Sequence, residues 1–128
     1  MQKEEKIASA FYITFSGTCK KALTLYQTCF GGDLHFDVFD KSIVGIEELP
    51  VISGFLVSDK ITIYGSDLVH NEGRRVGNFM AVYVHCKDSK ERFNYLQKLS
   101  NNHFSKNHSE QKLIEITDAF EVRWIFGI

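Results

Sequence analysis

The chain has 128 residues, 44% hydrophobic and 24% charged, which is ordinary globular usage at a length that favours one domain spanning residues 1–128. Fifteen Lys and Arg against sixteen Asp and Glu leave a formal net charge of −1, and neither sign forms a long block, so we expect no nucleic-acid partner. No apolar run approaches the roughly 20 residues that span a bilayer, and the first residues lack the apolar core of a signal peptide. We therefore expect a cytoplasmic protein without a membrane partner.

The first predicted strand and helix are the clearest elements in the chain. Residues 11–15 are apolar and β-prone, and Ser16, Gly17 and Thr18 then break the strand and offer hydroxyls to cap a helix. The following residues place apolar side chains at helical spacing until Gly31 and Gly32 stop the helix. The apolar positions are Cys19, Ala22, Leu23, Tyr26, Cys29 and Phe30.

Three further strands complete the first half. Residues 34–39 alternate apolar and polar side chains, and residues 51–57 and 60–64 read as two strands joined by a turn at Ser58 and Asp59. Residues 41–50 are irregular, and the polar stretch 66–78 reads as a connection. The order β-α-β-β-β follows.

The second half repeats this order about 68 residues later. Residues 79–86 alternate as a strand, and Asp88 followed by Glu91 forms a capping box for a helix with Phe93, Leu96 and Leu99 on one side. Short strands are predicted at residues 103–106, 113–117 and 121–128.

The three cysteines, Cys19, Cys29 and Cys86, are odd in number and contain no CxxC pair. Two of them lie on the apolar face of the first predicted helix. This pattern favours buried, reduced thiols over disulfides or a zinc site.

Three segments resemble the vicinal-oxygen-chelate superfamily, and its PhnB-like branch in particular. They are FYITFSGTCKKALTLYQTCFGG at residues 11–32, ITIYGSD at residues 61–67 and DAFEVRWIF at residues 118–126. The first is similar to the branch's aromatic-x-Gly-x-Cys/Ala turn and ALxxY…FGG helix, and the last to its DxFGxxW strand. At the Gly position of that last motif this chain has Glu121.

The resemblance implies an α+β protein with the glyoxalase/bleomycin-resistance-like fold. Two βαβββ modules, residues 9–67 and 78–128, would form curled mixed sheets around a cavity, usually in a homodimer. Some members of the superfamily bind a divalent metal, as in glyoxalase I and extradiol dioxygenases, whereas others carry no metal and sequester a drug.

The metal-ligand positions implied by the resemblance are mostly apolar in this chain. They fall at Ala10 or Phe11, at Ile63 or Tyr64, at Phe79 and at Ile125. A catalytic metal needs three or four nitrogen or oxygen donors. We therefore expect no metal and no other cofactor.

The five histidines do not indicate a metal or catalytic site. His35 and Asp37 share a strand face and are interpreted as solvated, and His85 ends its strand on the face of Tyr83, at the mouth of the implied cavity. His70, His103 and His108 lie in polar loops. No GxSxG elbow or glycine-rich phosphate loop is present, so the sequence identifies no catalytic residue.

Period-two alternation indicates which side chains would line the implied cavity. An aromatic wall with a few polar groups suits a small apolar or aromatic molecule. Arg123 has two interpretations, because it could meet an anionic group of a ligand or form a cross-strand ion pair with Glu115. The candidate ligand-binding residues are Tyr12, Thr14, Thr62, Tyr64, Phe79, Tyr83, His85 and Arg123.

Two functions remain open. The first is a metal-free protein that binds or sequesters a small apolar or aromatic molecule, or that has lost ligand binding and survives as a dimeric scaffold. The second is a metal-dependent lyase or dioxygenase with donors drawn from His35, Asp37, His70 or Glu72. The identity of the ligand and the arrangement of a dimer do not follow from the sequence.

Overall fold

The structure is a computed structural model that describes residues 9–39, 49–67, 76–104 and 111–128. The chain divides into two compact units, Met1–Arg75 and Val76–Ile128, and each is described by itself. Among the described residues, no helix has the length and apolar character needed to cross a membrane.

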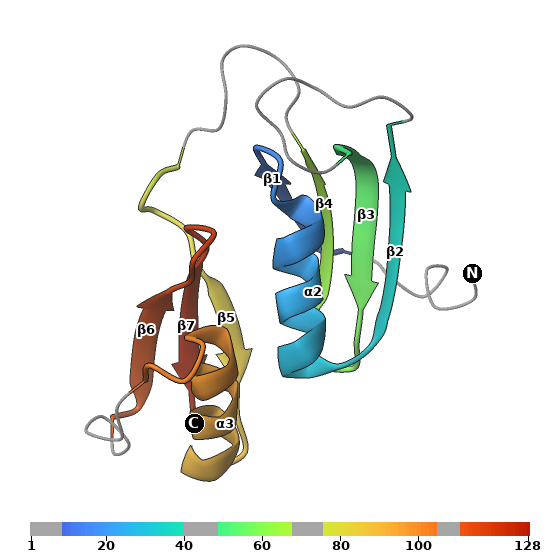
Figure 1. Cartoon of the computed structure of the whole chain (residues 1–128). Coiled ribbons are helices and arrows are strands. Elements are labelled where there is room, and N and C mark those ends of the chain that lie inside the picture. The colour runs from blue at the N-terminus through green and yellow to red at the C-terminus, as the bar shows by residue number, and fades with distance from the viewer. Residues whose placement is uncertain (1–8, 40–48, 68–75, 105–110) are drawn as a thin grey trace. The chain divides into compact units, whose positions relative to one another are not determined.

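The first unit is a four-stranded mixed sheet with one helix on one face (Figure 1). The strand order is β1-β4-β3-β2, with β1 parallel to β4 and the other neighbours antiparallel. The predicted β-α-β-β-β order is confirmed. The elements are β1 (Phe11–Phe15), α2 (Cys19–Phe30), β2 (Asp33–Val38), β3 (Val51–Val57) and β4 (Thr62–Asp67).

The core of the first unit lies between α2 and the sheet. Helix α2 begins and ends where its sequence predicts, and Gly31 and Gly32 adopt the positive φ angles of 74° and 102° that stop it. The fully buried side chains include Phe15, Cys19, Leu23, Tyr26, Leu56 and Ile63. Since alternate strand residues point to opposite faces, their neighbours in sequence on β1, β3 and β4 lie on the helix-free face.

The start of α2 differs from the prediction. Thr18 is the N-cap residue but its hydroxyl makes no capping hydrogen bond. The carboxylate of Asp67, at the end of β4, takes that role instead: Oδ1 accepts the backbone N–H groups of Gly17 at 2.8 Å and Cys19 at 3.0 Å. Its Oδ2 accepts the N–H of Val51 at 2.8 Å, so one buried side chain joins β4, the β1–α2 turn and the start of β3.

The turn between β3 and β4 is longer than predicted. Ser58 Oγ donates to the carbonyl of Ile61 at 2.8 Å and accepts the Ile61 N–H at 3.0 Å. This turn absorbs Lys60 and Ile61, so β4 begins at Thr62 and extends to Asp67 rather than covering residues 60–64. Ser66 and Asp67 therefore belong to a strand and not to the predicted connection.

The second unit repeats part of this arrangement. Its three-stranded sheet has the order β5-β7-β6, with β5 parallel to β7 and β6 antiparallel to it. The predicted strand 103–106 is not found at His103 and Phe104, and residues 105 and 106 lie outside the described residues. The elements are β5 (Val82–His85), α3 (Ser89–Leu99), β6 (Leu113–Thr117) and β7 (Arg123–Gly127).

The predicted capping box of α3 is confirmed, with one change. Asp88 Oδ1 accepts the N–H of Glu91 at 2.8 Å, but Glu91 Oε1 accepts the N–H of Lys87 at 3.1 Å, one residue before the N-cap. The ring of Tyr95 on α3 lies 6.1 Å from that of Phe126, centroid to centroid, so α3 packs on the face of β7 that carries Phe126.

The turn before β7 is organised by a second buried carboxylate. Asp118 Oδ1 accepts the N–H groups of Phe120 at 2.8 Å and Val122 at 3.1 Å, and Oδ2 accepts Trp124 Nε1 at 2.9 Å. Glu121 has a φ of 67°, which glycine adopts most easily. This explains why the similar motif has Gly at this position. Because the turn includes Glu121 and Val122, β7 begins at Arg123 and not at the predicted residue 121.

Candidate functional site

The helix-free face of the first sheet brings together the four candidates of the first half. Tyr12 on β1 is paired with Tyr64 on β4, and Thr14 with Ser66. Tyr12 is 62% exposed, whereas Thr14, Thr62 and Tyr64 are half-buried. Their common orientation follows from alternation with the buried residues Phe15 and Ile63.

The strand register extends this pair into an aromatic row across all four strands. Tyr64 is opposite Phe55 on β3, and Phe55 is opposite His35 on β2. The Phe55 ring lies 5.6 Å from that of Tyr64 and 5.4 Å from that of His35, the latter stacked at 26°. The aromatic row therefore consists of Tyr12, Tyr64, Phe55 and His35, of which Phe55 and His35 were not predicted as ligand-binding residues.

One end of the aromatic row carries a polar group. His35 Nε2 lies 3.3 Å from Asp37 Oδ1, and Ser53 Oγ lies 3.5 Å from Asp37 Oδ2. Both side chains of the His35 and Asp37 pair are more than half exposed. They lie on the same strand face, as predicted, and His35 is also stacked on Phe55 rather than only solvated.

On the second sheet, the helix-free face carries Tyr83 and His85. The Tyr83 hydroxyl lies 3.1 Å from His85 Nδ1, and both side chains are exposed. The Tyr83 ring lies against Gly127, where a Cβ atom would come within 3.0 Å of two ring carbons. Gly127 thus makes room for the ring, and the two predicted residues form a hydrogen-bonded pair.

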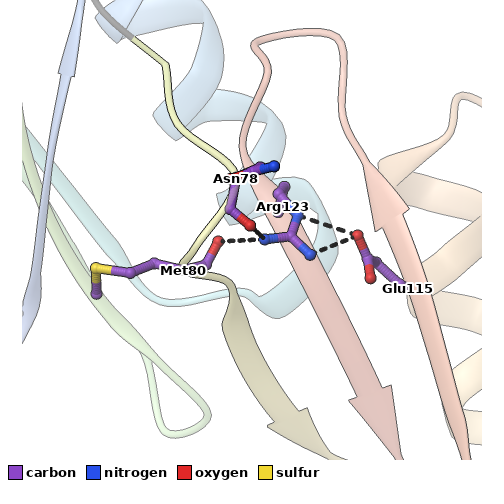
Figure 2. A network of polar contacts seen from close by, with 4 residues as sticks. All are labelled: Asn78, Met80, Glu115 and Arg123. Atoms are coloured by element: carbon purple, nitrogen blue, oxygen red, sulfur yellow. Dashed lines mark hydrogen bonds and ion pairs between the residues drawn. The ribbon is translucent and has the colours of Figure 1, made fainter.

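Arg123 forms the cross-strand ion pair with Glu115 that its strand position allowed. Figure 2 shows its guanidinium group between the Glu115 side chain on β6 and the backbone before β5. Nε and Nη2 donate to Glu115 Oε2 at 3.0 and 2.8 Å, while Nη1 donates to the carbonyls of Asn78 and, at 3.2 Å, Met80. Ligand contact by Arg123 stays a prediction, and it would have to compete with these bonds.

The Arg123 contacts also explain why β5 is short. The predicted strand 79–86 is paired with β7 only from Val82 to His85, because β7 itself begins at Arg123. Before Val82 the side chain of Arg123 binds the backbone carbonyls in place of a strand partner. Phe79 consequently lies outside the strand and is 86% exposed, and its predicted role in a cavity wall stays untested.

The described residues do not supply a metal site of the glyoxalase type. Of the implied ligand positions, Ile63 is buried in the core, and Tyr64, Phe79 and Ile125 offer at most one phenol oxygen. No group of three or more His, Cys, Asp or Glu in the described ranges is placed to hold a metal ion. His70 and Glu72, two donors of the alternative hypothesis, lie outside those ranges.

The predicted state of the cysteines is confirmed, because Cys19, Cys29 and Cys86 are all buried thiols outside any disulfide. Burial, and secondarily the nearby Asp67 carboxylate, raises the pKa of the Cys19 thiol from 9.0 to about 12. Cys19 is therefore a neutral core side chain and not a nucleophile.

This pKa predicts an alkaline loss of stability. Between pH 9 and about 12 the unfolded chain releases the Cys19 proton while the folded protein keeps it, so the free energy of unfolding should fall as the pH rises through this window. Urea denaturation at several pH values measures the slope. The Cys19→Ala variant should show a shallower slope, and an equal slope in both proteins would contradict the assignment.

Comparisons with known proteins identify the fold. Neither a protein-family model nor a curated protein sequence matches the chain. The chain is similar to the solved structure of a PhnB protein from Bacillus cereus, with a TM-score of 0.72, 18% identity and coverage of 94% of this chain and 98% of that one. It is also similar to protein PA1353 from Pseudomonas aeruginosa, with a TM-score of 0.70, 17% identity and coverage of 95% and 97%.

A third similar structure is the fosfomycin resistance protein FosX from Listeria monocytogenes, complexed with Mn(II) and a sulfate ion. Its TM-score is 0.60 at 13% identity, with coverage of 94% of this chain and 90% of that one. These similarities confirm the predicted glyoxalase/bleomycin-resistance-like fold and the resemblance to PhnB-like proteins. At such identities they establish a fold and no activity.

Proposed function

We propose that this protein binds a small, flat, apolar or aromatic molecule without the help of a metal ion. The observation that carries the proposal is the composition of the helix-free face of the first sheet. There the aromatic row is flanked by the hydroxyl groups of Thr14, Ser53, Thr62 and Ser66. Rings with a few polar groups beside them are the usual lining of a small-molecule site.

The residues of this chain at the implied metal-ligand positions support the same conclusion. The similar FosX structure is a complex with Mn(II). At three of the four ligand positions that the resemblance implies, this chain instead has Tyr64, the exposed Phe79 and Ile125. Tyr64 forms part of the aromatic row, and Ile125 lies between Tyr83 and Glu115 in the strand register. The side chains on these faces favour contact with rings over coordination of a metal ion.

The proposal includes two properties of the whole protein. We propose that the helix-free face of the first sheet forms a wall of the cavity implied by the fold, and that the protein works as a cytoplasmic homodimer. Sedimentation equilibrium tests the dimer directly, with a mass near twice the 14.7 kDa of one chain as the expected result.

A ligand screen read by thermal denaturation tests the binding function. A molecule that binds only the folded state stabilises it by about 2.7 kcal/mol at one hundred times its dissociation constant, which raises the melting temperature by several degrees. Flat aromatic compounds should raise it equally with and without EDTA. The Tyr12→Ala variant, which loses the most exposed ring of the aromatic row, should show a smaller rise.

The outcome distinguishes the two candidate functions. A rise that disappears with EDTA and returns with manganese would support the metal-dependent lyase or dioxygenase instead. If no aromatic compound raises the melting temperature of the parent protein, the binding function itself is wrong.

A further inference from the structure

One end of the aromatic row lies at an edge of the sheet. Strand β2 is the last strand in the order β1-β4-β3-β2, and within the described ranges the imidazole of His35 has a ring neighbour, Phe55, on one side only. The side chain of His35 is 52% exposed, whereas Phe55 is 7% exposed. A further flat ring could therefore extend the stack by resting on the outer face of His35.

The polar group at this end is the Asp37 carboxylate, which can accept further hydrogen bonds. Asp37 Oδ1 lies 3.3 Å from His35 Nε2 and Oδ2 lies 3.5 Å from Ser53 Oγ, which are long contacts for a group that accepts several hydrogen bonds. The Asp37 side chain is 63% exposed. It can accept a further charged donor without giving up a buried interaction.

The surrounding strands give this end a negative character. None of β1, β2, β3 and β4 contains a lysine or an arginine, whereas β2 carries both Asp33 and Asp37 on the face of His35. The described basic residues of this unit, Lys20, Lys21 and Lys60, lie on α2 and in the β3–β4 turn. Among the described residues of this unit, the charges on this face therefore favour a cation over an anion.

We propose that the ligand of this face is a flat aromatic cation, with its ring stacked on His35 at the end of the aromatic row and its positive group against Asp37. This inference rests on the proposed function and adds the charge of the ligand and its position. Stacking gives affinity to any flat ring, and the carboxylate selects the cationic ones.

Three fluorescent or absorbing probes of similar size test the charge preference. They are proflavine, a planar cation at pH 7.5, acridine, which is neutral there, and 9-anthracenecarboxylate, an anion. In titrations of the parent protein, proflavine should bind most tightly, acridine less tightly and 9-anthracenecarboxylate least tightly. The proposal is overturned if the anion binds as tightly as proflavine, or if proflavine does not bind.

Two substitutions test the two contacts separately. Asp37→Asn should weaken proflavine binding about threefold to fivefold, as expected for one exposed ion pair, and leave acridine within about twofold. His35→Ala should weaken both proflavine and acridine, because it removes the stacking surface. Both residues are exposed, so the variants should fold, which the circular dichroism spectrum checks.

A matched control separates a contact from a general charge effect. Asp59→Asn makes the same change in net charge in the exposed β3–β4 turn, and it should leave proflavine binding unchanged. An equal loss in Asp59→Asn and Asp37→Asn would overturn the position of the cation. If other aromatic compounds stabilise the protein while the His35 and Asp37 variants bind them normally, the proposed function stands and this inference fails.

Discussion

The Asp67→Ala variant is expected to lose about 3–5 kcal/mol of its free energy of unfolding. The Asp67 carboxylate accepts three backbone N–H groups, those of Gly17, Cys19 and Val51, and two of these hydrogen bonds are buried. Hydrogen bonds to a charged acceptor are worth about 1.5–3 kcal/mol each, so the two buried ones together account for about 3–6 kcal/mol. The total is a large part of the 5–15 kcal/mol that stabilises a typical domain.

Urea denaturation followed by circular dichroism measures this loss. Asp67→Asn should lose less, because its single carbonyl oxygen still accepts hydrogen bonds while its amide group faces a donor. Asp59→Ala, which removes an exposed carboxylate in the next turn, should change the stability by no more than about 0.5 kcal/mol. A loss below about 1 kcal/mol in Asp67→Ala would show that water replaces the carboxylate.

The Asp118→Ala variant is expected to lose about 2–4 kcal/mol. Its carboxylate accepts the N–H groups of Phe120 and Val122 and the indole N–H of Trp124, which is fully buried. Without the carboxylate the indole nitrogen is left without its acceptor inside the core, and the turn that holds Glu121 at positive φ loses two hydrogen bonds.

A double-mutant cycle isolates the contact between Asp118 and Trp124. Asp118→Ala, Trp124→Phe and the double variant should show a coupling energy of about 1–2 kcal/mol, because Phe fills much of the core volume but has no donor. Circular dichroism is the suitable probe, since Trp124 is the only tryptophan of the chain. Additive losses within about 0.5 kcal/mol would mean that the hydrogen bond contributes nothing to stability.

These two carboxylates explain why the resemblance predicts the fold and leaves the reaction open. Asp67 ends the segment ITIYGSD, and Asp118 opens the segment DAFEVRWIF. In the structure both side chains point into their own unit and bind backbone groups of turns. These two carboxylates therefore maintain architecture. The face that would contact a ligand is formed by other side chains, some in the same segments, such as Tyr12 and Tyr64, and some outside them, such as Phe55 and His35.

The elements set by local chemistry were predictable from the sequence. Helix α2 has its predicted bounds because helical spacing and two glycines are sufficient to define it, and the Asp88 cap of α3 acts within four residues. The cap of α2 was not predictable, because Asp67 lies 48 residues from Cys19. Hydroxyls adjacent to the helix were the only local candidates.

The candidate site likewise contains residues that local sequence predicts and residues that only the tertiary structure identifies. Alternation placed Tyr12 with Thr14, and Thr62 with Tyr64, on one face of their own strands, and the pairing of β1 with β4 brings the four together. The role of Phe55 and His35 depends on the register between β2, β3 and β4, which no single strand reveals. The alternation of residues 34–39 did place His35 away from the core, but only the register shows that its ring is stacked.

The central claim is that the helix-free faces offer rings and hydroxyls in place of metal ligands. Elemental analysis of protein purified without chelators tests it most directly. We expect divalent metal far below one ion per chain, with no gain after incubation with manganese and dialysis. One tightly held ion per chain, lost on substitution of His35 or Asp37, would contradict it.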